Sequence, residues 1–221
     1  MGSAAPEGAM SLYLVLDGPD GCGKTSQAEA LCQWLRAAGA EVLHIREPGS
    51  TPVGEAIRDL LLDPDTGHLA VFTEALLFYA ARAELIQKQV APALRAGHVV
   101  VAERCYLSTV VYQGLAPIDG PGISVALLDQ LTAAVHRTVL PDAVFVLDVA
   151  PEVGAARRER RDEDRIESRG EDYQCRVRQG FLDAASRDDR IHVVDANGPL
   201  DVVQEELRRR VKALGTTSRD E

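Results

Sequence analysis

Short apolar runs alternate with longer segments of helical period along this chain. The apolar runs are rich in β-branched residues, which is typical of strands buried on both faces. They lie at residues 12–16, 42–45, 99–101, 144–149 and 191–194. The helical period is clearest at residues 26–38, 74–94, 125–135 and 200–214. This alternation predicts an α/β fold with a five-stranded parallel sheet flanked by helices on both faces.

The length and composition fit a single domain. With 221 residues, 46% of them hydrophobic, the chain can bury a sizeable core. Residues 1–10 lack the charged and apolar regions of a signal peptide and are rich in small residues, so we expect a disordered leader. We expect one domain over residues 11–214 and a flexible tail over residues 215–221.

Net charge, the length of apolar runs and cysteine spacing argue against nucleic-acid partners, membrane partners and a structural metal site. The net charge of −10 would repel DNA or RNA, and no basic stripe offsets it. No apolar run approaches the roughly 18 residues that span a bilayer, so we expect no membrane partner and a cytoplasmic location. The four cysteines show neither CxxC spacing nor histidine partners at zinc-finger distances, which argues against a structural metal site.

A phosphate-binding loop follows the first predicted strand. Residues 18–25 read Gly-Pro-Asp-Gly-Cys-Gly-Lys-Thr, which matches the GxxxxGK[ST] pattern between a strand and a helix. The loop N–H groups and the N-terminus of the next helix make an anion cradle. Lys24 then reaches the β and γ phosphates, and the Thr25 hydroxyl binds Mg²⁺. The pattern predicts a P-loop NTPase fold that binds a nucleoside triphosphate, but it leaves the acceptor open.

An acceptor site is predicted where the third strand ends. Glu103 and Arg104 follow that strand, and Arg104, Ser108 and Tyr112 fall on one helical face. Open α/β sheets bind ligands at this edge.

A second candidate pair lies on the helix that contains residue 74. Phe78 and Arg82 stand four residues apart and share a face. On this pair alone, a core Phe with an exposed Arg is the simpler interpretation.

The only break in composition is a charged stretch from residue 157 to residue 169. Its segment 157–167 holds five arginines and five acidic residues, so a solvated helix is one interpretation. Phosphoryl transfer, however, needs positive charge around the transferred group and exclusion of water. We therefore expect a small mobile lid at about residues 154–169 that carries arginines to the site.

The order and spacing of the motifs give the chain a clear family resemblance. Over residues 12–214 it resembles the bacterial thymidylate kinases. The resemblance rests on five blocks, which lie at residues 17–25, 46–51 with 54–58, 77–82, 104–113 and 164–167.

The resemblance implies a role for each residue at the acceptor side. Phe78 would stack on thymine, Thr109 and Gln113 would bind its edge, and Tyr112 would crowd the sugar 2′ position. The acceptor phosphate would be held by Arg58, Arg82 and Arg104. Asp20 would bind the 3′-hydroxyl, Glu47 and Pro48 would line the pocket, and Ser108 would add a further substrate contact. A cis bond is implied before Pro48.

The resemblance also implies the donor side and the catalytic groups. ATP would lie on Gly18, Pro19, Asp20, Gly21, Cys22, Gly23, Lys24, Thr25 and Ser26, with Arg157 toward the adenine. Mg²⁺ would be held by Thr25 and Glu103. The predicted catalytic residues are Lys24, Arg104, Asp20 and a lid arginine, Arg161 first and Arg160 second.

Four features depart from the family pattern or select a branch of it. Gly21 stands where one branch has a basic residue, which assigns the catalytic arginine to the lid. Glu103 replaces an Asp and carries its carboxylate about 1.5 Å further out. Cys105 replaces an aromatic residue or His, and an Arg usual after Gln113-Gly114 is missing.

The predicted activity is therefore transfer of the γ-phosphoryl group of ATP to dTMP. Three alternatives stay open: a deoxynucleoside kinase, a kinase for another nucleoside monophosphate, and a nucleotide-binding regulatory module without turnover. Glu103 and Cys105 are the sequence features that favour the last of these. The family resemblance also implies a homodimer.

Overall fold

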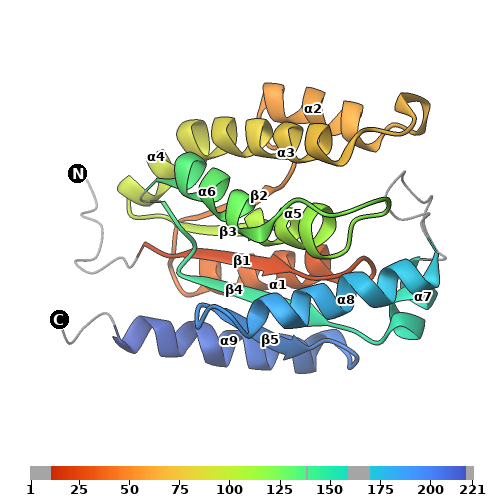
Figure 1. The fold of residues 1–221 in the computed structure, drawn as a ribbon. Helices are drawn as coiled ribbons and strands as arrows, with labels where there is room; N and C mark the ends of the chain where they lie inside the picture. The colour runs from red at the N-terminus through yellow and green to blue at the C-terminus, as the bar shows by residue number, and fades with distance from the viewer. Residues whose placement is uncertain (1–10, 138, 159–169, 218–221) are drawn as a thin grey trace.

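A five-stranded parallel sheet forms the centre of the molecule (Figure 1). The computed structural model describes residues 11–137, 139–158 and 170–217. In spatial order the strands are β2 (Val42–Arg46), β3 (Val99–Glu103), β1 (Tyr13–Asp17), β4 (Ala143–Asp148) and β5 (Ile191–Asp195). Every neighbouring pair is parallel. The predicted sheet is confirmed.

Side chains of the central strand alternate between two cores. Tyr13 and Val15 pack into the core on one face of the sheet, whereas Leu14 and Leu16 pack into the core on the other. All four are fully buried. A strand that is covered on both faces needs apolar residues at every position, which explains its continuous apolar run.

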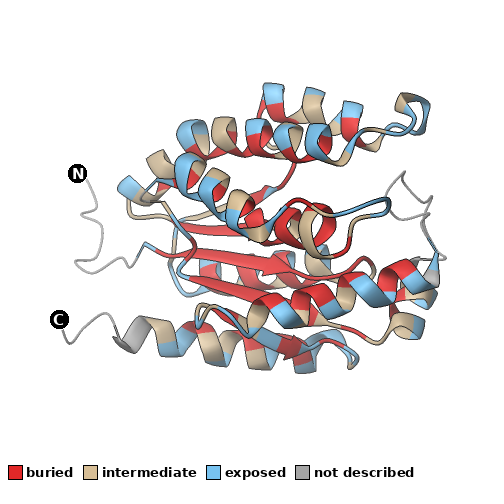
Figure 2. Cartoon of the chain, viewed as in Figure 1, coloured by how far each residue is buried: buried red, intermediate tan, exposed pale blue. Residues whose placement is uncertain are grey.

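Helices cover both faces of the sheet. On one face, α1 (Lys24–Ala37) and α9 (Leu200–Thr217) pack against the sheet and each other. The opposite core is closed by α3 (Val71–Leu85), α5 (Tyr106–Thr109), α6 (Val125–His136) and α8 (Glu171–Ala185). Helix α2 (Pro52–Leu62) lies against α3, farther from the sheet (Figure 1). Figure 2 shows that buried residues fill the strands and the inward helix faces.

Two helical runs contain a π-helical turn. The segment predicted as one helix over residues 74–94 consists of α3, the π-turn η2 (Ile86–Val90) and α4 (Ala91–Arg95). Pro92 has no N–H, so the α-helical bond to the carbonyl of Lys88 cannot form there. Helix α5 likewise continues into the π-turn η3 (Val110–Leu115). Such turns are frequent at functional sites.

Some elements differ from the sequence prediction. Helices α2 and α8 were not among the predicted segments, and α9 ends at Thr217, later than residue 214. A 3₁₀ turn, η1 (Pro64–Thr66), links α2 to α3. Helix α7 (Pro151–Arg158) contains the beginning of the predicted lid. The rest of the lid, residues 159–169, lies outside the described residues, as do the leader 1–10 and residues 218–221. No helix in the described ranges has the length and hydropathy to cross a bilayer.

Candidate active site

The turn between β1 and α1 forms the predicted phosphate loop. Gly21 and Gly23 have φ angles of 81° and 93°, which residues other than glycine rarely adopt. Helix α1 begins directly after Gly23, and no side chain makes a hydrogen bond that caps it. The first N–H groups of a helix have no partner within it, so here they face the loop as anion donors.

Lys24 curls back over this loop. Its Nζ donates to the carbonyl oxygens of Gly18 and Pro19 at 3.0 and 2.9 Å, and lies 3.9 Å from Oδ1 of Asp20. The ammonium group is therefore held at the mouth of the anion cradle, where a phosphate would replace weak carbonyl partners.

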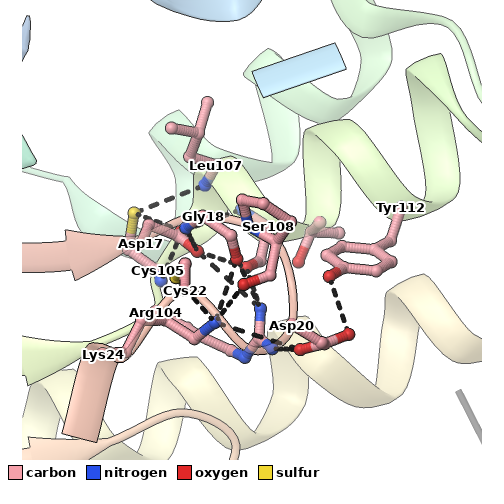
Figure 3. Close-up of polar contacts among 12 residues, drawn as sticks. Asp17, Gly18, Asp20, Cys22, Lys24, Arg104, Cys105, Leu107, Ser108 and Tyr112 are labelled. Atoms are coloured by element: carbon pink, nitrogen blue, oxygen red, sulfur yellow. Dashed lines mark hydrogen bonds and ion pairs between the residues drawn. The ribbon is translucent and has the colours of Figure 1, made fainter. Parts of the chain in front are cut away.

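Asp20 connects the loop to the end of β3 (Figure 3). Oδ1 forms a short ion pair with Nη2 of Arg104, and Oδ2 accepts from the hydroxyl of Tyr112 at 3.1 Å. Burial works to raise the pKa of Asp20, but Arg104 and Lys24 outweigh it and hold the pKa below its usual value. The carboxylate stays ionised, and it orients a cation on each side.

Arg104 occupies a strained position. Its φ of 69° is in the left-handed region, which costs a non-glycine residue about 1 kcal/mol or more. The guanidinium donates to Ser108 Oγ at 3.1 Å and lies over the Tyr112 ring at 5.6 Å. Strain of this kind persists only where the surroundings fix it, and it favours a functional interpretation of Arg104.

The surroundings of Arg104 are fixed by Asp17, a residue that the sequence prediction did not assign to the site. It is fully buried at the end of β1. It accepts from Ser108 Oγ at 2.7 Å and from the N–H groups of Gly18 and Cys105 at 2.9 and 3.3 Å. These contacts join the phosphate loop to the segment after β3 (Figure 3).

A hydroxyl and a carboxylate meet beside the phosphate loop. Thr25 Oγ1 donates to Oε2 of Glu103 at 2.5 Å, and Nε2 of His44 lies 3.0 Å from Oε1. Burial opposes ionisation of Glu103, but the contacts with His44 and Thr25 lower its pKa overall. Mg²⁺ takes oxygen ligands and is bound through one or two carboxylates together with substrate phosphates. The pair fits Mg²⁺, and the described residues contain no group of three or more metal-ligating acidic, His or Cys side chains.

One continuous cavity of about 500 Å³ opens at these groups. It extends from the phosphate loop to α3, so donor and acceptor could meet inside it. Most of the predicted site residues line it, namely Asp20, Gly21, Gly23, Lys24, Thr25, Ser26, Glu47, Pro48, Arg58, Phe78, Glu103, Arg104, Ser108, Thr109, Tyr112, Gln113 and Arg157.

A buried ion pair lies behind the cavity wall. Arg82 Nε donates to Oε2 of Glu47 at 2.6 Å, and Nη2 donates to Thr109 Oγ1 at 3.2 Å. Arg82 is 2% exposed and does not line the cavity, so direct contact with an acceptor phosphate stays a prediction. The bond between Glu47 and Pro48 is cis, as the family resemblance implied, and Arg58 donates to the carbonyl of Pro48 at 3.0 Å.

Arg157 marks the opposite end of the cavity. Its Nη1 donates to the carbonyl oxygen of Ala196, just after β5, at 3.0 Å. This bond anchors the guanidinium beside β5, and contact of Arg157 with the adenine stays a prediction.

A few predicted residues do not line the cavity. Gly18, Pro19 and Cys22 belong to the loop but are absent from the cavity wall, and Arg161 and Arg160 lie outside the described residues. Arg46 and Leu62 line the wall although no role had been assigned to them. Arg46 ends β2 next to Glu103 in register, a position that only the strand order reveals.

Comparison with known proteins gives a consistent result. The family model described as "Thymidylate kinase" matches residues 16–207. The thymidylate kinase of Symbiobacterium thermophilum is 42% identical over 93% of this chain and 94% of its own length. That of Deinococcus radiodurans is 39% identical over 94% and 99%.

A solved structure supports the same assignment. The crystal structure of thymidylate kinase from Ehrlichia chaffeensis superposes with a TM-score of 0.73 at 30% identity, covering 91% of this chain and 99% of that one. The family model and the relatives extend over the phosphate loop, the segment after β3 and the helices that form the cavity. The chain therefore belongs to the thymidylate kinase family.

Proposed function

We propose that this enzyme transfers the γ-phosphoryl group of ATP to dTMP. A phosphate oxygen of dTMP attacks the γ-phosphorus, the bond from that phosphorus to the β,γ-bridging oxygen breaks, and dTDP and ADP form. The observation that carries the proposal is the single cavity that joins the phosphate loop to Phe78, with Asp20 and Arg104 between them. Phosphoryl transfer needs such positioning together with fixed positive charge, and no covalent enzyme intermediate.

On the donor side, the loop N–H groups and Lys24 hold the β and γ phosphates. Thr25 and Glu103 would hold Mg²⁺, which would supply positive charge to the phosphates. Arg157 faces the adenine side. A lid arginine, Arg161 first, completes the charge around the transferred group.

On the acceptor side, Phe78 stacks on the base and Tyr112 lies against the sugar. Arg58 and Arg104 hold the phosphate, because a group with a charge of nearly −2 needs cations around it. Asp20 accepts from the 3′-hydroxyl while it orients Arg104. Arg82 acts on this site through Glu47 and Thr109.

An assay that couples ADP release to NADH oxidation tests the activity. ADP release should require dTMP and should be at least about tenfold less efficient with CMP, AMP or dUMP, since small differences in a pocket discriminate by roughly 10- to 200-fold. Equal turnover with thymidine would establish a deoxynucleoside kinase instead.

Lys24→Ala separates a kinase from a nucleotide-binding module. A kinase loses nearly all acceptor-stimulated turnover, because the variant removes a charge that contacts the transferred group. A module shows no such turnover in the parent protein.

We infer in addition that the enzyme is a homodimer. Four large apolar side chains on α2 and α3 are between 45% and 50% exposed, namely Val53, Leu60, Phe72 and Leu76. Clustered exposed apolar residues mark interaction surfaces. Light scattering coupled to size exclusion tests this state. The expected cytoplasmic location stays a prediction.

A further inference from the structure

Gln113 and Glu74 form a buried polar pair beside the base-binding end of the cavity. Nε2 of Gln113 lies 3.2 Å from Oε2 of Glu74, and the residues are 1% and 4% exposed. In this contact the amide NH₂ of Gln113 donates to the carboxylate oxygen of Glu74. The amide NH₂ of Gln113 must therefore face Glu74, and the amide oxygen must face away from it.

That amide oxygen is left without a donor. Oε1 of Gln113 is buried, and within the described parts of the chain no N–H or O–H group reaches it. A buried acceptor without a partner costs about 1–3 kcal/mol. Gln113 lines the cavity together with Phe78, so a donor on a stacked base can satisfy this oxygen.

The neighbouring Thr109 has the opposite polarity. Its Oγ1 accepts from Nη2 of Arg82 at 3.2 Å, and Thr109 also lines the cavity. Arg82 is itself fixed by the buried ion pair with Glu47. A hydroxyl that accepts one bond keeps its proton for donation, so Thr109 offers a donor where Gln113 offers an acceptor.

We propose that Glu74 is a positioning residue that sets pyrimidine specificity by fixing the amide orientation of Gln113. The inference rests on the proposed function and names how its acceptor base is selected. Thymine presents an N3–H donor beside a carbonyl acceptor, which complements the acceptor of Gln113 and the donor of Thr109. Cytosine presents an acceptor at N3 beside an amine donor, so it mismatches both.

The proposal separates two kinds of discrimination. Uracil has the same N3–H and carbonyl groups as thymine, so Glu74 does not affect the choice between dTMP and dUMP. It affects only the choice between imide bases and cytosine. A site built to hydrogen-bond a substrate group strongly rejects analogues that lack this group. A hydrophobic pocket discriminates much more weakly between substrates that differ by one methyl group.

Glu74→Gln tests the inference because it preserves the shape of the side chain but no longer requires Gln113 to point its NH₂ group toward residue 74. A glutamine at this position offers both an oxygen and an NH₂ group, so Gln113 can turn either way and present its NH₂ to N3 of cytosine. The ratio of kcat/KM for dTMP to that for dCMP should fall at least tenfold, mainly through KM. The ratio for dTMP to dUMP should stay within twofold. Calorimetric titration with dTMP and dCMP, without ATP, should show the same shift in Kd.

Glu84→Gln is the matched control, because Glu84 lies on the same helix but is only half-buried, whereas Glu74 is buried against Gln113. It should change neither ratio. If Glu74→Gln lowers both efficiencies by the same factor, the residue is merely structural and the proposal is wrong. If Glu74→Gln does not fold, the same two ratios of kcat/KM are measured for Glu74→Ala, with the same expected results. Failure of the parent protein to phosphorylate dTMP would instead overturn the proposed function.

Discussion

Nε2 of His44 lies 3.0 Å from Oε1 of Glu103. The two residues lie on neighbouring strands, and Thr25 holds the second carboxylate oxygen from the other side. Glu103 is one methylene longer than the Asp expected in this family, and its longer side chain brings a carboxylate oxygen close to the imidazole of His44. The carboxylate that we propose for Mg²⁺ binding therefore has a side-chain contact at each of its two oxygens.

Substituting His44→Leu should weaken the metal site without removing its ligands. Residues that orient a ligand typically contribute about 10-fold or more to metal affinity. We expect about a 10-fold rise in the Mg²⁺ concentration for half-maximal rate, and the same loss in Mn²⁺ binding followed by electron paramagnetic resonance with ADP present.

A double-mutant cycle gives the control for this prediction. In a Glu103→Asp background the shorter carboxylate no longer reaches His44, so His44→Leu should have little further effect. Equal losses in both backgrounds would show that His44 acts elsewhere.

Gly21 approaches the backbone of α7 closely enough to exclude any side chain. A Cβ at this position would lie 2.3 Å from the carbonyl oxygen of Gly154, and φ is 81°. Gly21→Ala and Gly21→Arg should therefore displace the phosphate loop and lower kcat/KM for ATP by at least about tenfold, since shifts near 1 Å cost up to about a hundredfold.

Gly39→Ala is the control for backbone conformation alone. Its φ is 91°, but a Cβ there meets nothing within 4 Å. It should lower the free energy of unfolding by about 1 kcal/mol and leave ATP kinetics unchanged. Comparable kinetic losses in both variants would show that the Gly154 contact is unimportant.

Glu47 and Arg82 form the buried ion pair behind the cavity. Burial raises the pKa of Glu47 against the effect of Arg82. Glu47→Gln leaves a buried guanidinium without its counter-charge, which should cost about 3–5 kcal/mol in urea unfolding.

The exposed pair Arg46–Glu55 is the matched comparison, with side chains 52% and 40% exposed. Glu55→Gln should cost less than about 1 kcal/mol. A similar cost for both variants would contradict the importance of burial.

His136 should make stability depend on pH. Burial, with a contribution from Arg82, lowers its pKa from 6.5 to about 4, and Nδ1 donates to the carbonyl of Val139 at 2.9 Å. The unfolded chain therefore binds a proton at a higher pH than the folded one. This stability is complete above pH 6.5 and is lost as the pH falls toward 4, by at most about 3 kcal/mol.

His136→Asn keeps an amide donor near the position of Nδ1 but does not titrate. Urea unfolding of both proteins at several values between pH 7.5 and pH 4.5 should give a smaller decline for the variant. Parallel curves would exclude His136 as a source of the pH dependence.

The sequence predicted the elements whose signal is local. Each strand was visible as an apolar run, and the phosphate loop was visible from its glycines and Lys24. The His44 contact was not predictable, because it depends on β2 lying next to β3, and that order is set by packing. Asp17 was missed for a similar reason, since its partners come from another part of the chain. Arg82 was assigned to the site by the family resemblance, and neither the resemblance nor its spacing to Phe78 could show that it is buried in an ion pair with Glu47 and does not line the cavity.

Asp20 acts as an internal counter-ion for Arg104 and Lys24. It lies within reach of both side chains and orients them. Phosphates that enter therefore meet cations that are already in place. Little rearrangement of these cations is needed on binding, and the carboxylate that stays beside them offsets part of their electrostatic attraction to nucleotide.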